Sequence, residues 1–187
     1  TVGRAASIKL LDETLPQTKI IGLLTQRDET KEDPEPQDLY SIGTAAIVLK
    51  LIRQSDNHLI IVVQGLRRFA LRKIIATDPY LRAEVELLNS KLPPTTKEWE
   101  ATFRNLRDSA AKLLELTPDV PEQARAAVLS IEDPEQLADF LAPNLNVETA
   151  QKQAILEELD VEKRLATVQT AISAQLEIAQ IQQKLQQ

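Results

Sequence analysis

The 187-residue chain lacks cysteine and methionine altogether, and it contains one histidine and four glycines. Without cysteine, neither disulfides nor thiolate metal sites can form, which fits a reducing compartment. His58 alone cannot build a histidine-rich metal site, and the nucleophile elbow of a Ser-His-Asp triad is absent. The glycines are too far apart for a phosphate-binding loop. The sequence therefore predicts no metal, nucleotide or other cofactor in this chain.

Long apolar runs are also absent. No stretch approaches the roughly 20 apolar residues of a membrane-spanning helix, and no signal-peptide pattern opens the chain. We therefore expect no membrane partner and a cytoplasmic location. The lack of methionine and the start at Thr1 indicate a piece of a longer protein.

The net charge of −6 lies entirely in the second half of the chain. Residues 1–90 carry 12 basic and 12 acidic side chains, whereas residues 91–187 carry 10 and 16. An acidic chain repels phosphate backbones, which argues against nucleic acid as the main partner. The basic cluster within residues 67–73 could contact an anion, but it is more typical of the solvated face of a strand.

Paired carboxylates occur at Asp12-Glu13 and Glu157-Glu158, among others. A general acid requires a desolvated carboxyl group, and no apolar run contains an isolated Asp or Glu. Solvated surface is the better interpretation of these pairs. We therefore expect no catalytic residue.

The first half alternates short apolar runs with turn signals after a predicted helix that ends at Pro16. Five runs are predicted strands: 19–25, 44–53, 59–64, 68–75 and 81–88. Residues 26–38, with their prolines, form a predicted exposed loop, and residues 55–58 a hairpin turn. In residues 81–88 apolar and charged side chains alternate, which predicts one buried and one solvated face. Five short strands favour a small, mostly antiparallel barrel or rolled sheet.

The second half follows the helical period. Pro93-Pro94 interrupts the chain, and residues 95–98 (TTKE) have the capping-box form that opens a helix. Trp99 and Phe103 begin the apolar stripe of that helix, so we expect both in a helical core. Further helices are predicted after Pro118.

One of these helices begins at Asp133-Pro134, and we expect its Leu137, Phe140 and Leu141 to face inward. The last stretch, residues 161–187, contains neither glycine nor proline and follows Asp160, a predicted cap. Its apolar residues recur every three to four positions, as in a coiled-coil seam, although an ordinary bundle helix fits its first half equally well.

Beyond about Gln175 the last helix becomes rich in glutamine, which favours a helix that leaves the domain as a connector. We therefore predict an α+β protein. A small antiparallel, barrel-like β-domain spans residues 1–92, and an all-α helical bundle that ends in a long helix spans residues 93–187.

Seven short motifs, in one order, resemble the amino-terminal region of Lon-type ATP-dependent proteases. In the first half they are residues 2–9 (VGRAASIK), 26–28 (QRD), 38–44 (DLYSIGT), 64–69 (QGLRRF, with Gln64 in place of the usual acid) and 80–85 (YLRAEV). In the second half they are residues 131–140 (IEDPEQLADF) and 153–165 (QAILEELDVEKRL). Each motif is weak alone, but their order and spacing over nearly the whole chain are specific.

The resemblance implies a β-domain similar to pseudouridine-synthase-associated (PUA-like) folds, followed by a helical bundle. It also implies that the family's first strand, ahead of Val2, is missing, so the β-domain has an exposed edge unless something covers it. The complete family enzyme is a homo-hexamer in which an ATPase ring, using ATP and Mg²⁺, feeds unfolded protein to a Ser-Lys serine peptidase. Neither the ATPase nor the peptidase motif occurs in this sequence. The implied role is recognition and delivery of unfolded, damaged or regulatory protein substrates.

Recognition of unfolded chains requires exposed apolar surface or free strand edges. We predict substrate contacts at Lys9, in the first helix, and at Tyr40 and Ile42, after the proline-bearing loop. The structural alternative is that Lys9 is a solvated charge and that Ile42 simply begins a strand.

Two other functions compete with substrate recognition. A stand-alone ligand-binding or adaptor module with a Lon-like domain would match the first half of the chain only. RNA binding rests on fold-level analogy, and the acidic balance argues against it.

Overall fold

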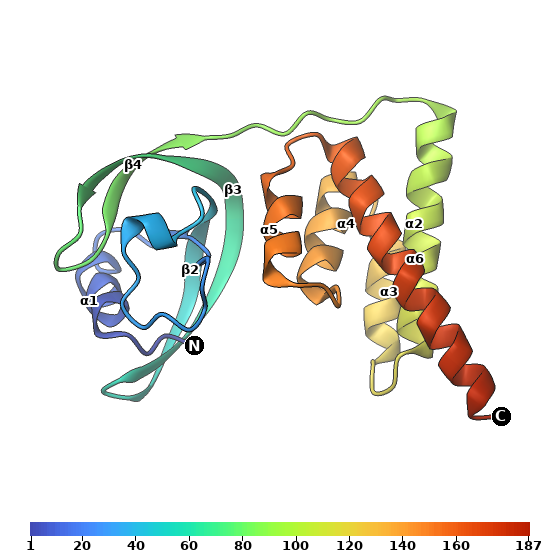
Figure 1. The fold of residues 1–187 in the computed structure, drawn as a ribbon, viewed down its shortest axis with the longest axis horizontal. Coiled ribbons are helices and arrows are strands. Elements are labelled where there is room, and N and C mark those ends of the chain that lie inside the picture. The colour runs from blue at the N-terminus through green and yellow to red at the C-terminus, as the bar shows by residue number, and fades with distance from the viewer. The chain divides into compact units, whose positions relative to one another are not determined.

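The chain forms two compact units, residues 1–89 and residues 90–187, in a computed structural model that describes all 187 residues (Figure 1). We call them the β-unit and the helical unit. The division falls slightly before the predicted boundary at 92/93, because Ser90 and Lys91 already bond to the helical unit. None of the helices has the length and apolarity required to cross a membrane.

The β-unit is an antiparallel sheet preceded by one helix, so the predicted α+β class is confirmed. Its elements are α1 (Ala5–Thr14), β1 (Ile20–Leu23), the 3-10 helix η1 (Pro36–Asp38), β2 (Ile42–Ser55), β3 (His58–Ala76) and β4 (Arg82–Leu87). The strands lie in the order β1-β2-β3-β4, so each pairs with its neighbour in sequence. The β2–β3 hairpin is far longer than the strands on either side of it.

The sheet has four strands where five were predicted. Residues 59–64 and 68–75 belong to one strand, β3, which does not break at Gly65. Ala45 pairs with Arg67 and Ala46 with Gly65, so Leu66 is the extra residue of a β-bulge. A glycine within an apolar run signals a bulge as readily as a turn, and here the strand continues through it.

One glycine of the β-unit is required by close packing. A Cβ atom at Gly43 would overlap the carbonyl oxygen of Leu23 and would lie 2.9 Å from Cζ of Phe69. Gly22 lies against the same ring, at 3.1 Å. The absence of side chains at these two positions leaves room for the Phe69 ring, which is almost fully buried.

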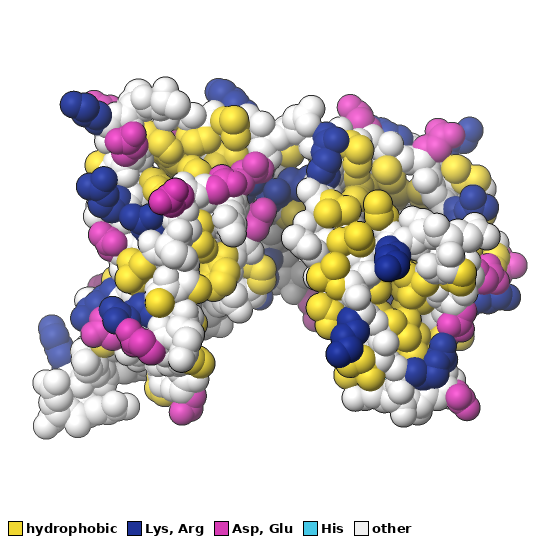
Figure 2. Space-filling view, turned by 180° about the vertical axis from the view of Figure 1, so that it is seen from behind, with side chains coloured by type: hydrophobic (Ala, Val, Ile, Leu, Met, Phe, Trp, Pro, Cys, Tyr) yellow, Lys and Arg dark blue, Asp and Glu magenta, His cyan; other side chains and the backbone are white.

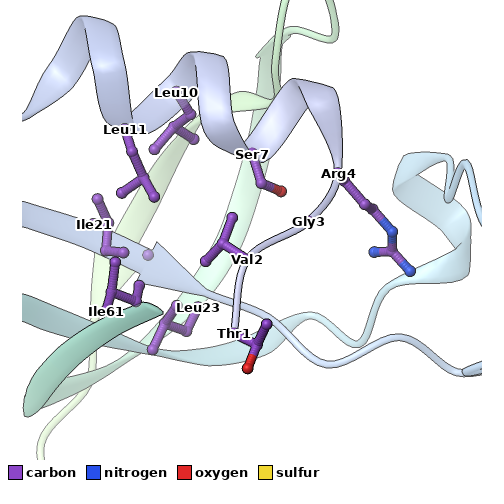
Figure 3. Close-up of a pocket in the computed structure, with 11 residues that line it drawn as sticks. Thr1, Val2, Gly3, Arg4, Ser7, Leu10, Leu11, Ile21, Leu23 and Ile61 are labelled. Carbon is purple, nitrogen blue, oxygen red and sulfur yellow. The ribbon is translucent and has the colours of Figure 1, made fainter. Parts of the chain in front are cut away.

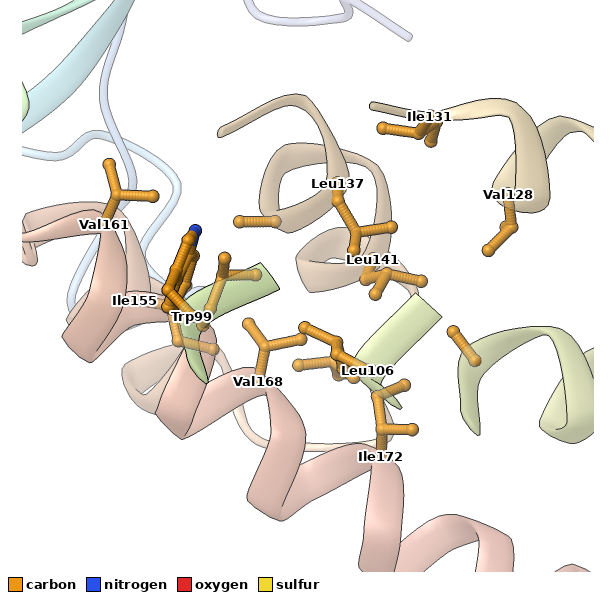
Figure 4. Close-up of a cluster of buried hydrophobic side chains, with 14 residues drawn as sticks. Trp99, Leu106, Val128, Ile131, Leu137, Leu141, Ile155, Val161, Val168 and Ile172 are labelled. Atoms are coloured by element: carbon orange, nitrogen blue, oxygen red, sulfur yellow. The ribbon is translucent and has the colours of Figure 1, made fainter. Parts of the chain in front are cut away.

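The helical unit contains five α-helices and one 3-10 helix. They are α2 (Lys97–Leu116), α3 (Glu122–Ser130), α4 (Pro134–Leu141), η2 (Ala142–Asn144), α5 (Thr149–Glu157) and α6 (Val161–Leu185). Figure 4 shows their apolar side chains converging on one core, to which α2, α3, α4, α5 and α6 all contribute.

Trp99 lies in this core with 9% of its surface exposed, and Phe103 packs against the core from its margin, as predicted. Leu137 and Leu141 are also buried. The prediction for Phe140 is wrong, because 39% of its surface is exposed. In a helix as short as α4, Leu137, Ala138 and Leu141 complete the inward face, which leaves Phe140 beside it.

Three helices begin where a side chain caps the first backbone N–H groups. Oγ1 of Thr96 accepts a hydrogen bond from the Trp99 N–H at 3.1 Å, so α2 begins one residue later than the capping-box pattern predicts. Asp133 caps α4 and Asp160 caps α6, both as predicted. In α6 the buried stripe ends at Ile172, and beyond it Ile178 and Ile181 are more than half exposed.

Candidate polypeptide-binding surface

The sheet of the β-unit has one face under α1 and one face without a covering helix. Ile21 and Ile61 line a cavity together with Leu11 of α1, so their side chains point toward α1. Successive strand residues point to opposite faces, and directly paired residues share a face. The pairs Ile20–Ile47 and Ile52–Ile60 therefore lie on the other face. We call this the open face, and its apolar members are Ile20, Ile47, Ile52, Ile60 and Val62.

The open face exposes a large share of its apolar side chains. Ile20 is 50% exposed, Val62 46% and Ile52 41%, while Ile47 and Ile60 are half-buried. Figure 2 shows hydrophobic side chains reaching the surface of the β-unit over a broad area, between separate basic side chains. Lys50 is paired with Val62 and Gln64 with Ile47, so polar side chains lie among the apolar ones on this face. Exposed apolar side chains gathered on one face are typical of a surface that binds another polypeptide.

On the α1 side of the sheet the structure contains a cavity of about 480 Å³ (Figure 3). Its lining residues come from the first residues of the chain, α1, β1 and β3: Thr1, Val2, Gly3, Arg4, Ser7, Leu10, Leu11, Ile21, Gly22, Leu23 and Ile61. Most of these side chains are apolar. The guanidinium of Arg4 reaches away from the cavity, where it donates a hydrogen bond to the carbonyl oxygen of Lys31 at 3.3 Å. The cavity therefore offers apolar contact with few fixed polar groups.

The long strand β3 has an unpaired edge. Its contacts with β4 begin only at Phe69, whereas its pairing with β2 begins at the hairpin turn. On the side away from β2, Val2 forms an isolated antiparallel bridge with Leu59, with hydrogen bonds of 2.7 and 2.8 Å. Beyond this bridge, residues 60–66 have no strand on that side. A free edge of this kind can accept an extended chain.

The structure places the three predicted contact residues on different elements. Lys9 is exposed on α1. Tyr40 follows η1. The Arg27 guanidinium stacks over its ring, 4.6 Å from the centroid, and its N–H donates to the carbonyl oxygen of Thr25. Ile42 is the first residue of β2 and is half-buried opposite Ala70. None of the three belongs to the open face.

The loop that precedes Tyr40 is held by ionic contacts. Nζ of Lys31 lies 2.7 Å from Oδ2 of Asp38, and this hydrogen bond lowers the pKa of the Asp38 carboxyl group. Hydrogen bonds from Thr30 lower the pKa of Asp28 in the same way. The amide of Gln26 also donates to the Lys31 carbonyl oxygen at 2.9 Å. The loop therefore has a defined conformation that depends on ionised carboxylates.

Strand β4 differs from its prediction. Its apolar side chains were expected to form a buried face, but Val85 is 46% exposed and Leu87 48%. β4 is an edge strand, and its apolar side is only partly covered. The alternation in its sequence therefore did not predict the exposure of its apolar side chains.

The open-face residues were missed as a candidate site, although the sequence contained a signal for them. Residues 44–53 and 59–64 are apolar at consecutive positions, not at alternate ones. Such a strand has apolar side chains on both faces and needs cover on both. α1 is the only α-helix of the β-unit and lies on the opposite face, so Ile20, Ile52 and Val62 remain exposed.

The chain offers no recognisable site for the ATP and Mg²⁺ that the family resemblance implies. A phosphate-binding loop needs glycines close together before a helix, whereas Gly22 and Gly43 lie in strands against Phe69. No group of three or more His, Cys, Asp or Glu residues could hold a metal ion. His58 lies at the exposed start of β3.

The order of elements defines an α+β module in which an antiparallel sheet precedes a helical bundle. Residues 1–174 match the substrate-binding domain of ATP-dependent protease La (Lon). The chain belongs to this family, and the resemblance seen in its motifs is confirmed.

Relatives along the whole chain support this assignment. The chain is 40% identical over 185 residues to Lon protease of Dictyoglomus thermophilum, a match that covers 99% of this chain and 23% of that protein. It is 36% identical to Lon protease 2 of Myxococcus xanthus, over 98% of this chain and 22% of that protein. The chain thus spans less than a quarter of the length of these curated relatives.

The fold is also similar to a solved structure, the N-terminal domain of Mycobacterium avium complex Lon protease. The TM-score is 0.61, with 21% identity, and the similarity covers 83% of this chain and 90% of that one. At this identity the likeness supports the fold.

Proposed function

We propose that this chain is the substrate-recognition and delivery region of an ATP-dependent Lon protease that degrades unfolded, damaged and regulatory proteins. The observation that carries the proposal is an apolar open face in a chain of the Lon substrate-binding family. The chain itself binds and does not cleave. Its partner is any polypeptide that exposes apolar side chains.

The open face suits an unfolded chain for a physical reason. Folded proteins hide most of their apolar side chains, whereas unfolded chains expose them together with unpaired backbone groups. Burying an exposed side chain such as Val62 or Ile20 contributes about 25 cal/mol per Å² of apolar surface removed from water. A mobile substrate loses conformational entropy when it is held, so a single site binds weakly, at about micromolar affinity or poorer.

The remaining parts of the reaction belong to the parent protein. ATP, Mg²⁺, the ATPase ring and the Ser-Lys peptidase lie outside the chain in this proposal, and the parent acts as a cytoplasmic homo-hexamer. Six copies of a weak site raise the apparent affinity for one long substrate, because later contacts become intramolecular. The isolated chain should therefore bind less tightly than the whole enzyme.

The helical unit favours this role over a stand-alone adaptor. The family match continues to residue 174, and two relatives matched over 98% or more of the chain are named Lon proteases. The coding sequence downstream of Gln187 separates the two, since a Lon gene continues into an ATPase and a Ser-Lys peptidase.

The direct test is a titration of the 187-residue chain into a labelled, permanently unfolded protein and into its folded parent. We expect measurable binding of the unfolded form and far weaker binding of the folded one. Binding should persist at high salt, because screening weakens ionic contacts and not apolar burial. Equal binding of both forms, or complete loss of binding in moderate salt, would contradict the proposal.

Variants place the site on the open face. The double substitution Ile52→Thr/Val62→Thr keeps β-branched side chains and removes apolar surface. It should weaken binding roughly tenfold, which corresponds to about 1.4 kcal/mol. Ile75→Thr is the matched control, because Ile75 is 54% exposed near the far end of the same strand as Val62. If the control weakens binding as much as the double variant, the open face is not the site.

A further inference from the structure

The motif that includes Asp160 and Val161 also contains Arg164, a side chain for which substrate binding supplies no role. Arg164 lies near the start of α6 and is fully buried. A guanidinium group taken out of water is costly unless hydrogen bonds surround it. Its partners therefore indicate what holds it there.

Arg164 joins three segments of the helical unit. Its Nε and Nη2 donate to the carbonyl oxygen of Glu158 at 2.9 and 2.6 Å. Nη2 also lies 3.2 Å from Oγ of Ser90, and Nη1 lies 3.3 Å from Oε1 of Glu135. These partners come from the α5–α6 turn, the residue at which the chain enters the unit, and the start of α4.

Lys91, the residue after Ser90, is held by hydrogen bonds of its backbone. The Lys91 N–H donates to the carbonyl oxygen of Leu159 at 2.8 Å, and the Val161 N–H donates to the carbonyl oxygen of Lys91 at 3.0 Å. The side chain of Lys91 is 80% exposed, so its 3.6 Å ion pair with Asp160 contributes little. The entry segment is therefore fixed by main-chain bonds beside the buried arginine.

We propose that Arg164 is a clamp that keeps residues 90–91, where the chain enters the helical unit, on the α5–α6 turn. On the β-unit side, the Leu88 N–H bonds to the Arg68 carbonyl oxygen at 2.9 Å, and Arg67 donates to Oδ1 of Asn89 at 2.7 Å. These bonds of residues 88–89 lie within the β-unit and do not involve the clamp. Release of the clamp frees residues 90–91 from that turn.

Trypsin provides a local test, because it cleaves after Lys91 only if the segment leaves its bonds. Cleavage of a transiently opened segment follows the population of the open form. In the whole chain, Arg164→Met fills similar space without donors and should accelerate cleavage at Lys91–Leu92 at least about tenfold, since several hydrogen bonds are lost together. Lys163→Met is the matched control, because Lys163 is an exposed cation on the same turn. It should leave that rate unchanged.

A purely structural role for Arg164 predicts a different pattern. Cleavage would then accelerate in parallel at all lysines and arginines of the helical unit, in step with a lower melting temperature, and that result would overturn the clamp. If Arg164→Met does not fold, Ser90→Ala removes one bond without altering the core. Ser90→Ala should then speed hydrogen exchange at the Lys91 amide and not at amides within α2. Unchanged exchange at Lys91 would equally refute the proposal.

Discussion

Replacing Trp99 with alanine tests the core of the helical unit. Trp99 is 9% exposed in a cluster with Leu106, Val168 and the side chains of α4, so its removal leaves a cavity that these neighbours cannot fill. Trp→Ala changes in cores cost about 3–5 kcal/mol. In a unit of this size, 1 kcal/mol lowers the melting temperature by about 4–8 °C. We therefore expect a decrease of about 12–40 °C in the transition of the helical unit.

The assay is thermal melting followed by far-ultraviolet circular dichroism, because the substitution also removes the only tryptophan and with it the fluorescence probe. Phe140→Ala is the control, since Phe140 is an aromatic residue of the same unit that is 39% exposed. It should cost less than about 1.5 kcal/mol. Similar melting temperatures for the two variants would show that Trp99 is not a core residue.

Three further predictions concern single positions. Gly43→Ala should destabilise the β-unit by about 1–3 kcal/mol, as overpacking does, whereas Gly3→Ala, whose Cβ would lie 3.8 Å from its nearest neighbour, should be tolerated in a denaturant titration. Lys31→Gln should raise the pKa of Asp38, measured by NMR titration of its carboxyl carbon, because Lys31 holds that pKa below its ordinary value. The sign follows from linkage: the ion pair stabilises the loop above the ordinary carboxyl pKa near 4, and this contribution is lost as the pH falls through the lowered value. Asp133→Ala should cost about 1 kcal/mol in thermal melting, because it removes the cap that accepts the Glu135 N–H.

The helical unit could be predicted well because its signals are local. Asp133 and Asp160 cap helices through side chains that act within one turn, and Trp99 follows the 3.6-residue period of a long helix. The error at Phe140 arose in α4, whose short length leaves the phase of an apolar stripe poorly defined.

The β-unit was harder to predict because its outcome depends on pairing between distant segments. Gly65 could mark either a turn or a bulge, and only the pairing of Ala45 and Ala46 with β3 decides between them. The role of Arg164 also depends on distant segments, and in the sequence Arg164 appeared only as one residue of a motif. Its partner Ser90 lies far away in the chain, and no periodicity connects the two.

The open face departs from the usual alternation of apolar and polar side chains in a sheet, and such a departure can indicate a binding function. A soluble sheet normally alternates apolar and polar side chains, and a helix covers any face that does not. Here the continuous apolar runs of β2 and β3 exceed what α1 can cover, and such exposure risks association between copies of the chain. Lys50 is directly paired with Val62, so its charge lies on the open face. This charge would have to be desolvated if the open faces of two copies met, which costs free energy. In the proposed function, a flexible unfolded chain bends around this lysine while its apolar side chains contact Ile20 and Ile52. The same surface can therefore disfavour a rigid, flat partner and still accept a mobile one.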